Sequence, residues 1–236
     1  MVIPTGKEGP DQYVLVLPGL VLVPDAGHRL LVTLGVSVNE VGTPQDPEAS
    51  GGQLGLYEFT LREGRWHLTG QVPSFAQGGA WGKDGGLQPL VLGGGRVGIA
   101  LTYIECHTGT CHSALEVLTL SAKGAKQVLS EPLHEDSDGW SGPCDAMVKR
   151  TTEAHAQGRT DFSASELHCY ATDGQMSLQS RGSDEWPDIK LTFTGESVQI
   201  DHKTFEARHT SNAGELVLRY DGERYKSLSG RNPIQH

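Results

Sequence analysis

Apolar and polar residues alternate in nearly the same way along two distant stretches of the chain. Residues 57–66 read YEFTLREGRW, and residues 216–225 read LVLRYDGERY. In each stretch, alternating apolar residues lead into an acidic turn that contains glycine, and an arginine and an aromatic residue follow. Alternation with a period of two around such a turn is the signature of a β-hairpin. The pattern therefore predicts a protein built from recurring antiparallel hairpins.

Further strands are predicted wherever short apolar or alternating runs lie between turn residues. They cover residues 13–17, 20–23, 29–38, 87–92, 96–104, 114–120, 125–129, 168–172, 175–179, 189–194, 197–201 and 205–209. A degenerate third hairpin is expected to turn at residues 121–124, and a polar span is expected to interrupt the pattern over residues 131–167. Helical composition is confined to residues 149–157 (KRTTEAHAQ), so little helix is expected.

The predicted elements fall into three units, each with a strand, an irregular insert and a closing hairpin. A closed propeller usually needs at least four blades, so these units are too few to close one. We therefore predict an all-β fold: an antiparallel meander of recurring hairpin units that forms a curled sheet or a sandwich. Residues 1–236 are expected to form a single β-rich domain, with a subdivision into 1–131 and 132–236 as the alternative.

Net charge narrows the possible partners. The chain carries a formal net charge of −10 and has a pI near 5.4. Nucleic acid is not expected as a ligand, because phosphate binding needs clustered Lys and Arg, and anionic membranes are disfavoured for the same reason. An acidic surface suits a basic protein partner, although it also simply keeps a protein soluble.

The longest uncharged apolar run, residues 13–23, is interrupted by Pro18 and Gly19. It is shorter than the roughly 20 residues of a membrane helix, so no transmembrane segment is expected. Lys7 is the one basic residue close before this run, and a signal peptide is not indicated. An exported protein is therefore expected to have lost its leader before residue 1.

Four cysteines form two groups. Cys106 and Cys111 flank the sequence HTGT, whereas Cys144 and Cys169 bracket a polar segment that we expect to be rich in loops. In a glycine-rich β protein this number suggests two disulfides and an oxidising compartment, with four free cytosolic thiols as the alternative. Three pairings are open. Proximity in sequence favours Cys106–Cys111 and Cys144–Cys169.

The cysteine loop also has the composition of a cofactor site. The sequence CHTGTCH over residues 106–112 is a stretched form of a haem-attachment signature and offers Cys and His donors for zinc. Neighbouring residues on one short loop cannot all reach a single ion. We therefore favour a disulfide-closed turn with exposed histidines, and no cofactor is expected.

The acidic segment around Asp136 and Asp138 has the D-x-D-G pattern of a calcium loop. It continues with Trp140 and Ser141 where an EF-hand would supply further oxygen ligands. A solvated acidic turn is therefore favoured over a calcium site.

No catalytic residue is predicted. The sequence contains no G-x-S-x-G elbow, no P-loop and no G-x-G-x-x-G motif, and its carboxylates show no pattern specific to glycoside hydrolysis. A metal-dependent or hydrolytic envelope enzyme that uses the His-rich or acidic loop is kept as the alternative.

Three tryptophans lie in stretches that contain Gly, Ser, Asp or Pro and do not read as strands. Exposed aromatic residues beside carboxylates are plausible anchors of a protein interface, although each Trp could instead fold back over an end of a sheet. The candidate partner-binding residues are Trp81, Trp140, Trp186, Glu135, Asp136 and Asp138.

Two sets of residues resemble those of a known class of proteins. They are the hairpin ends at residues 62–66 and 220–225, and the cysteines Cys144 and Cys169, the second followed by Tyr170. They resemble segments of exported β-rich proteins of Gram-negative bacteria, which include periplasmic immunity proteins of type VI secretion effectors. The resemblance implies a periplasmic, non-catalytic protein that neutralises a basic secreted toxin or hydrolase. It transfers no binding residues. A structural component of the cell envelope that binds glycan or another subunit is a further alternative.

Overall fold

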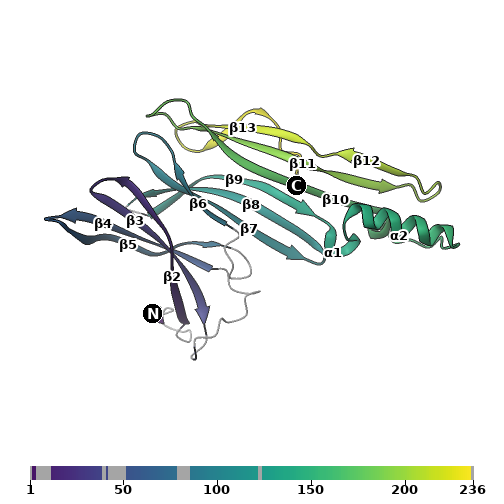
Figure 1. Ribbon diagram of the computed structural model, residues 1–236, viewed down its shortest axis with the longest axis horizontal. Helices are drawn as coiled ribbons and strands as arrows, with labels where there is room; N and C mark the ends of the chain where they lie inside the picture. The colour runs from purple at the N-terminus through teal and green to yellow at the C-terminus, as the bar shows by residue number, and fades with distance from the viewer. Residues whose placement is uncertain are drawn as a thin grey trace. The chain divides into compact units, whose positions relative to one another are not determined.

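The computed structural model describes residues 2–3, 12–38, 41, 52–78, 86–121 and 124–234 (Figure 1). Strands dominate these residues and form two antiparallel sheets, which confirms the prediction of an all-β fold. Helix is limited to one element of thirteen residues and two of four residues within the described part of the chain.

The smaller sheet has the strand order β1-β2-β3-β4-β5, and the larger has the order β14-β13-β11-β10-β9-β8-β7-β6, with β12 paired to β11. The smaller sheet contains β1 (Val2–Ile3), β2 (Gln12–Asp25), β3 (His28–Val38), β4 (Gly52–Arg62) and β5 (Arg65–Gly78). The larger contains β6 (Gly86–Val91), β7 (Val97–His107), β8 (Thr110–Ser121), β9 (Gly124–Asp136), β10 (His168–Gln179), β11 (Asp188–Ile200), β12 (Ala207–Ser211), β13 (Gly214–Tyr220) and β14 (Tyr225–Gly230). Neighbouring strands mostly follow one another in sequence, as a meander requires.

The chain forms two compact units. The first unit comprises Met1–Ile104, Leu115–Ser130 and Arg181–Trp186, and the second comprises Glu105–Ala114, Glu131–Ser180 and Pro187–His236. Strands β7, β8 and β9 contribute residues to both units. Whether the chain folds as a single domain stays a prediction.

The first unit is a β-sandwich. One face of the smaller sheet supplies Leu22, Leu30, Val32, Leu54 and Leu56, and these pack with apolar residues of β7 and β8 (Val97, Ile99, Leu101, Leu118 and Leu120). The alternation of apolar residues along each strand places them on the same side, so that both layers bury their apolar faces together.

Both hairpins that the alternation predicts are present. Strands β4 and β5 pair up to Arg62 and Arg65, and the two turn residues, Glu63 and Gly64, have φ angles of 51° and 72°. Positive φ at both positions is the geometry of a tight hairpin turn. Strands β13 and β14 pair up to Tyr220 and Tyr225, and Asp221 Oδ1 accepts hydrogen bonds from the Glu223 and Arg224 amides in the intervening turn.

The second unit contains the helices α1 (Asp138–Ser141), α2 (Cys144–Ala156) and α3 (Ala164–Leu167). The buried face of α2, with Cys144, Met147 and Thr151, packs in a cluster with Cys169, Val198 and Ile200.

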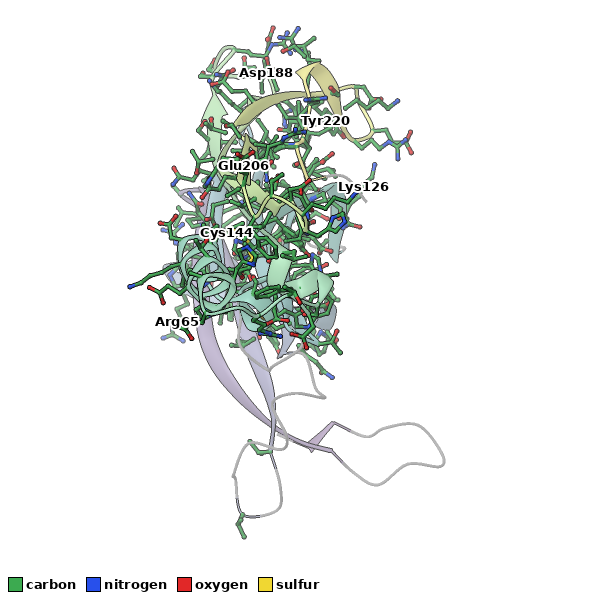
Figure 2. The ribbon with its side chains drawn as sticks, turned by 90° about the vertical axis from the view of Figure 1, so that its right-hand side faces the viewer. Arg65, Lys126, Cys144, Asp188, Glu206 and Tyr220 are labelled. Atoms are coloured by element: carbon green, nitrogen blue, oxygen red, sulfur yellow. A yellow bond between two sulfur atoms is a disulfide. The ribbon has the colours of Figure 1, made fainter. Side chains whose placement is uncertain are left out.

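Strands β11 and β13 of the second unit are antiparallel neighbours. Asp188, the first residue of β11, therefore lies near Tyr220, the last residue of β13 (Figure 2).

Several boundaries predicted from the sequence are wrong, and the strands predicted over residues 13–17 and 20–23 form the single strand β2. Residues 131–136 continue β9, and the segment between Cys144 and Cys169 is largely helical where a loop was expected. Strands β10 and β11 each run unbroken where two strands were expected, because Gly174 and Gly195 lie inside strands and not in turns. A Cβ at Gly195 would lie 2.1 Å from the Ala171 carbonyl oxygen, so this glycine permits close approach of two backbones.

Candidate functional site

The predicted acidic residues lie where β9 ends and α1 begins. Glu135 and Asp136 pair with Thr172 and Ala171 of β10, and Asp138 opens α1. We call Glu135, Asp136, Asp138 and Trp140 the acidic corner. Burial raises the pKa of the Tyr170 phenol, and the nearby charges of Glu135 and Asp136 raise it further. The field at this corner is therefore negative.

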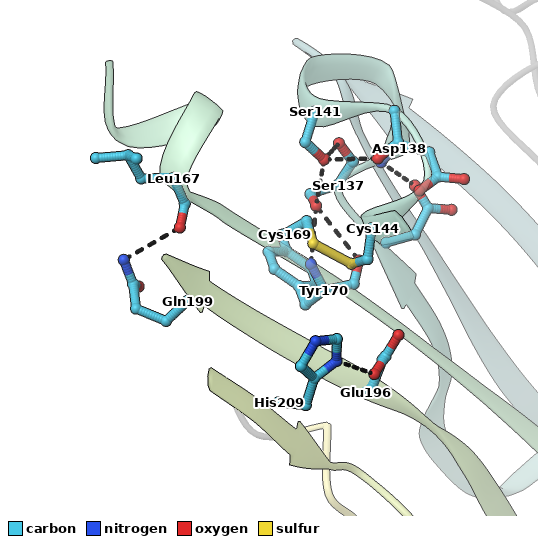
Figure 3. Close-up of a disulfide and its surroundings, with 12 residues drawn as sticks. Ser137, Asp138, Ser141, Cys144, Leu167, Cys169, Tyr170, Glu196, Gln199 and His209 are labelled. Atoms are coloured by element: carbon cyan, nitrogen blue, oxygen red, sulfur yellow. Dashed lines mark hydrogen bonds and ion pairs between the residues drawn. A yellow bond between two sulfur atoms is a disulfide. The ribbon is translucent and has the colours of Figure 1, made fainter. Parts of the chain in front are cut away.

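Ser137 fastens the acidic corner to β10. Its amide donates to the Tyr170 carbonyl at 3.0 Å, and its hydroxyl accepts from the Tyr170 amide at 3.0 Å. The Ser141 hydroxyl donates to the Ser137 carbonyl at 3.0 Å, which holds the far end of α1 to the same position (Figure 3). These bonds surround the disulfide between Cys144 and Cys169, so α1, α2 and β10 are joined at one place.

Trp140 is partly covered and partly exposed. Its side chain is 58% exposed, but one ring edge lies against the tip of the β7–β8 hairpin. A Cβ at Gly109 would lie 1.8 Å from Trp140 Cδ1, and a Cβ at Gly139 would lie 2.5 Å from Gly109 Cα. Only glycine fits at either contact. The indole thus packs against the cysteine loop through one edge and leaves much of its surface in solvent.

Both disulfides have the pairing that proximity favours. Cys106–Cys111 closes the hairpin tip that contacts Trp140, and Cys144–Cys169 connects α2 to β10. All four sulfurs are therefore oxidised and cannot serve as thiolate ligands for zinc or attach haem through thioethers. The prediction of two disulfides is confirmed, whereas the loop that the second was expected to close is helical.

His134 lies between two carboxylates. Its Nε2 is 2.6 Å from Asp136 Oδ2, and its Nδ1 is 2.7 Å from Asp173 Oδ1. A protonated imidazole donates from both ring nitrogens, so the two carboxylates favour the charged form of His134. Burial alone would lower the pKa of His134, but the hydrogen bonds to Asp136 and Asp173 outweigh it and raise the pKa above its ordinary value. A His held in this way connects β9 to β10 and offers no free nitrogen to act as a base.

The carboxylate of Asp136 is fully engaged by the protein. Besides the bond to His134, its Oδ1 accepts the Asp138 amide at 2.9 Å. A calcium ion held by Asp136 and Asp138 would have to compete with these bonds for the carboxylate oxygens. Among the described residues, no group of three or more His, Cys, Asp or Glu side chains is placed to hold a metal ion.

A groove of about 1070 Å³ opens beside Trp140. Its walls come from α1, α3, the ends of β10, β11 and β12 and the turn between β11 and β12, and they include Tyr170, His168, His202, Glu206 and Arg208. The lining combines aromatic rings with hydrogen-bonding groups, which suits a shaped and partly wet contact. We call it the Trp140 groove.

The other two predicted tryptophans lie outside the second unit or outside the described residues. Trp186 belongs to the first unit, where it is half-buried and the Arg96 guanidinium lies 5.2 Å from its ring centroid. Trp81 lies outside the described residues.

Sequence reasoning missed His134, Tyr170 and Gly109. His134 could have been found from the alternation, since it continues β9 at a spacing of two from Asp136. Gly109 gives no such signal, because its partner Trp140 is thirty-one positions away and only the folded chain brings them together.

No helix in the described part of the chain is long and apolar enough to cross a membrane. Comparison with known proteins found no matching family model, curated protein or solved structure. The acidic corner and the chemistry of the chain are therefore the features that indicate a function.

Proposed function

We propose that this protein is an exported, non-catalytic binding protein that neutralises a basic partner protein, in the manner of a periplasmic immunity protein against a secreted antibacterial effector. One observation carries the proposal: a 58% exposed tryptophan packs against a disulfide-closed loop and follows the carboxylates of Glu135, Asp136 and Asp138 in the chain. Tryptophan is one of the residue types enriched among those that dominate the energy of a protein interface.

Rigidity supports this reading. The acidic corner is fastened by the Ser137 hydrogen bonds and by two disulfides, so its side chains lose little conformational freedom when a partner binds. Binding energy that would be spent on ordering a mobile loop is then retained as affinity. The two disulfides also suit an oxidising, extracytoplasmic compartment.

Charge supports a basic partner. The second unit contains 17 Asp and Glu against 10 Lys and Arg, a formal net charge of −7. A negative field around the acidic corner speeds encounter with a cationic protein and disfavours anionic ones. The enzyme alternative gains no support at this corner, because both nitrogens of His134 are engaged and the cysteines are oxidised.

The test starts with a photo-crosslinking residue in place of Trp140 in periplasmically expressed protein, with Trp66 of the first unit, 44% exposed, as the matched position. Mass spectrometry then identifies what is captured. We expect a basic protein at position 140 that is absent at position 66. Capture of the same species at both positions, or of an acidic protein or a glycan at position 140, would contradict the proposal.

The identified partner is then titrated with the purified protein. Trp140→Ala is expected to weaken binding at least about 30-fold, whereas Trp66→Ala leaves it unchanged. Raising NaCl from about 50 to about 500 mM should slow association about tenfold, because salt screens the attraction between the acidic corner and a cationic surface. Periplasmic expression should protect cells from the partner, and Trp140→Ala should remove that protection.

A further inference from the structure

The smaller sheet of the first unit has a second face that is also apolar. Direct pairing places Val21, Leu31 and Tyr57 in one row across β2, β3 and β4. Arg29, Phe59 and Leu68 form the next row, and Leu61 and Trp66 form the last. We call the apolar residues on this side, together with Val23, the outer face: Val21, Val23, Leu31, Tyr57, Phe59, Leu61, Trp66 and Leu68.

The outer face is open to solvent at the residues that matter for docking. Val21, Val23, Leu61, Trp66 and Leu68 are each between 40% and 56% exposed. The opposite side of the same strands is already buried in the sandwich core, so this sheet is apolar on both sides. The solvent-facing side of an antiparallel sheet normally carries polar residues. A cluster of exposed apolar residues on that side marks an interaction surface.

Charge indicates what kind of partner fits. In the rows of the outer face the charged residue is Arg29, whose guanidinium lies 4.8 Å from the Trp66 ring centroid. Residues 21–31 and 57–68 together contain three Arg and three carboxylates and are neutral, in a chain with a net charge of −10. A basic partner finds no excess of negative charge to bind here, and an anionic membrane finds no excess of positive charge.

We propose that the outer face binds the outer face of a second copy of this chain and forms a two-fold symmetric dimer. Two identical acidic molecules repel each other, so they associate best where each is locally neutral. A two-fold interface uses the same patch twice, and flat sheets stack face to face about 10 Å apart. The Trp, Tyr, Phe and Arg content of the face matches the core of protein interfaces.

Sedimentation velocity of the full chain between about 1 and about 100 µM measures this association. The variant is Leu68→Glu and its matched control is Leu228→Glu on β14, since the two leucines are 51% and 50% exposed. We expect a concentration-dependent wild-type dimer, a dissociation constant at least about 100-fold higher for Leu68→Glu, and no change for Leu228→Glu. Circular dichroism checks that each variant folds, and Val21→Lys replaces Leu68→Glu if that variant does not.

Salt separates this dimer from the partner binding proposed above. Because the two copies repel, raising NaCl should leave the dimer as strong or stronger, whereas it should weaken the contact with a basic partner. Trp140→Ala should not affect the dimer. A wild-type monomer over the whole range overturns the dimer, as does a dimer that survives both Leu68→Glu and Val21→Lys. Binding of wild-type monomer to phosphatidylglycerol vesicles would assign the outer face to membranes instead.

Discussion

The two units of this protein are stabilised by different means. The first unit buries a continuous apolar cluster between two β layers. The second unit holds both disulfides, the His134 bridge and a two-bond ion pair in which Arg219 donates to the largely buried Asp188 at 2.9 and 2.7 Å. Covalent and charged contacts thus add to the buried apolar side chains of the second unit, such as Leu191 and Phe193.

The surfaces of the two units also differ in charge and in their exposed apolar residues. The first unit has a formal net charge of −3, with 12 Asp and Glu against 9 Lys and Arg, and its outer face is apolar. The second unit has a net charge of −7 and exposes Trp140, which follows three acidic residues in the chain. The comparison teaches that disulfides and side-chain hydrogen bonds concentrate in the unit that carries the proposed binding surface, where they hold its loops in place.

The largest expected effect comes from removing the disulfide that closes the longer loop. Cys144 and Cys169 are 25 positions apart, so replacing both by Ala should cost about 3.5 kcal/mol through loop entropy. Cys106 and Cys111 are 5 positions apart, and the same change there should cost about 2 kcal/mol. Hydrogen exchange measured by mass spectrometry should show faster opening in the second unit while the first unit stays protected.

Leu56→Ala provides the reciprocal control. Leu56 is 2% exposed in the sandwich core, and the cavity should cost about 2–5 kcal/mol. Faster exchange is expected in the first unit. If either change accelerated exchange equally in both units, the separation drawn between them would be wrong.

A smaller effect isolates the contact between the cysteine loop and Trp140. Gly109 and Gly64 have similar φ angles of 87° and 72°, but a Cβ at Gly64 meets nothing within 4 Å. Gly64→Ala should therefore cost only the backbone strain, about 1 kcal/mol. Gly109→Ala should cost about 2 kcal/mol, because it also pushes the indole away. Urea denaturation compares the two variants, and equal costs would show that the indole contact contributes nothing.

Much of the fold could be predicted from alternation and turn chemistry. The hairpins at residues 62–65 and 220–225 were identified because each combines a period of two with a turn that glycine and an acidic residue favour. The first and last residues of helix α2 could not be predicted in this way. Its buried residues, Cys144, Met147 and Thr151, include a polar threonine whose hydroxyl bonds the Glu166 carbonyl, so its pattern is weak without the fold.

The site was only partly within reach of the sequence. Trp140 and its acidic neighbours are adjacent in the chain, so composition alone could group them. The contact with Gly109, the hydrogen bonds of Ser137 and the outer face all join residues far apart in sequence. The outer face was missed for a further reason, because strands with apolar residues on both sides read as buried when no structure shows which side is covered.

The His134 bridge predicts that the second unit loses stability at alkaline pH. Because the pKa of His134 is raised in the fold, its contribution is complete below the unfolded value of 6.5 and is lost as the pH rises through the folded pKa. His134→Gln should therefore cost about 1 kcal/mol at pH 6 and less at pH 9. Denaturation at both pH values measures the difference, and a cost independent of pH would show that the imidazole is neutral in the fold.

The smallest expected effect on stability comes from Glu166, whose contribution is lost at acidic pH. Glu166 accepts hydrogen bonds from the Ser163 amide and from Arg159, and these lower its pKa to about 2. Its contribution is present above the unfolded value of 4.5 and is lost as the pH falls through about 2. Because 37% of the Glu166 side chain is exposed, solvent screening limits the cost of Glu166→Gln to about 0.5 kcal/mol at neutral pH.

His134→Gln and Glu166→Gln, measured together, test whether the pH dependence of stability is confined to the second unit. The cluster that holds the first unit contains no ionisable side chain, so hydrogen exchange in its strands should not respond to either variant at any pH. Thermal unfolding of Glu166→Gln at pH 7 and pH 2 should differ from wild type only at pH 7. A difference that persisted at pH 2 would mean that the glutamate acts through packing and not through its charge.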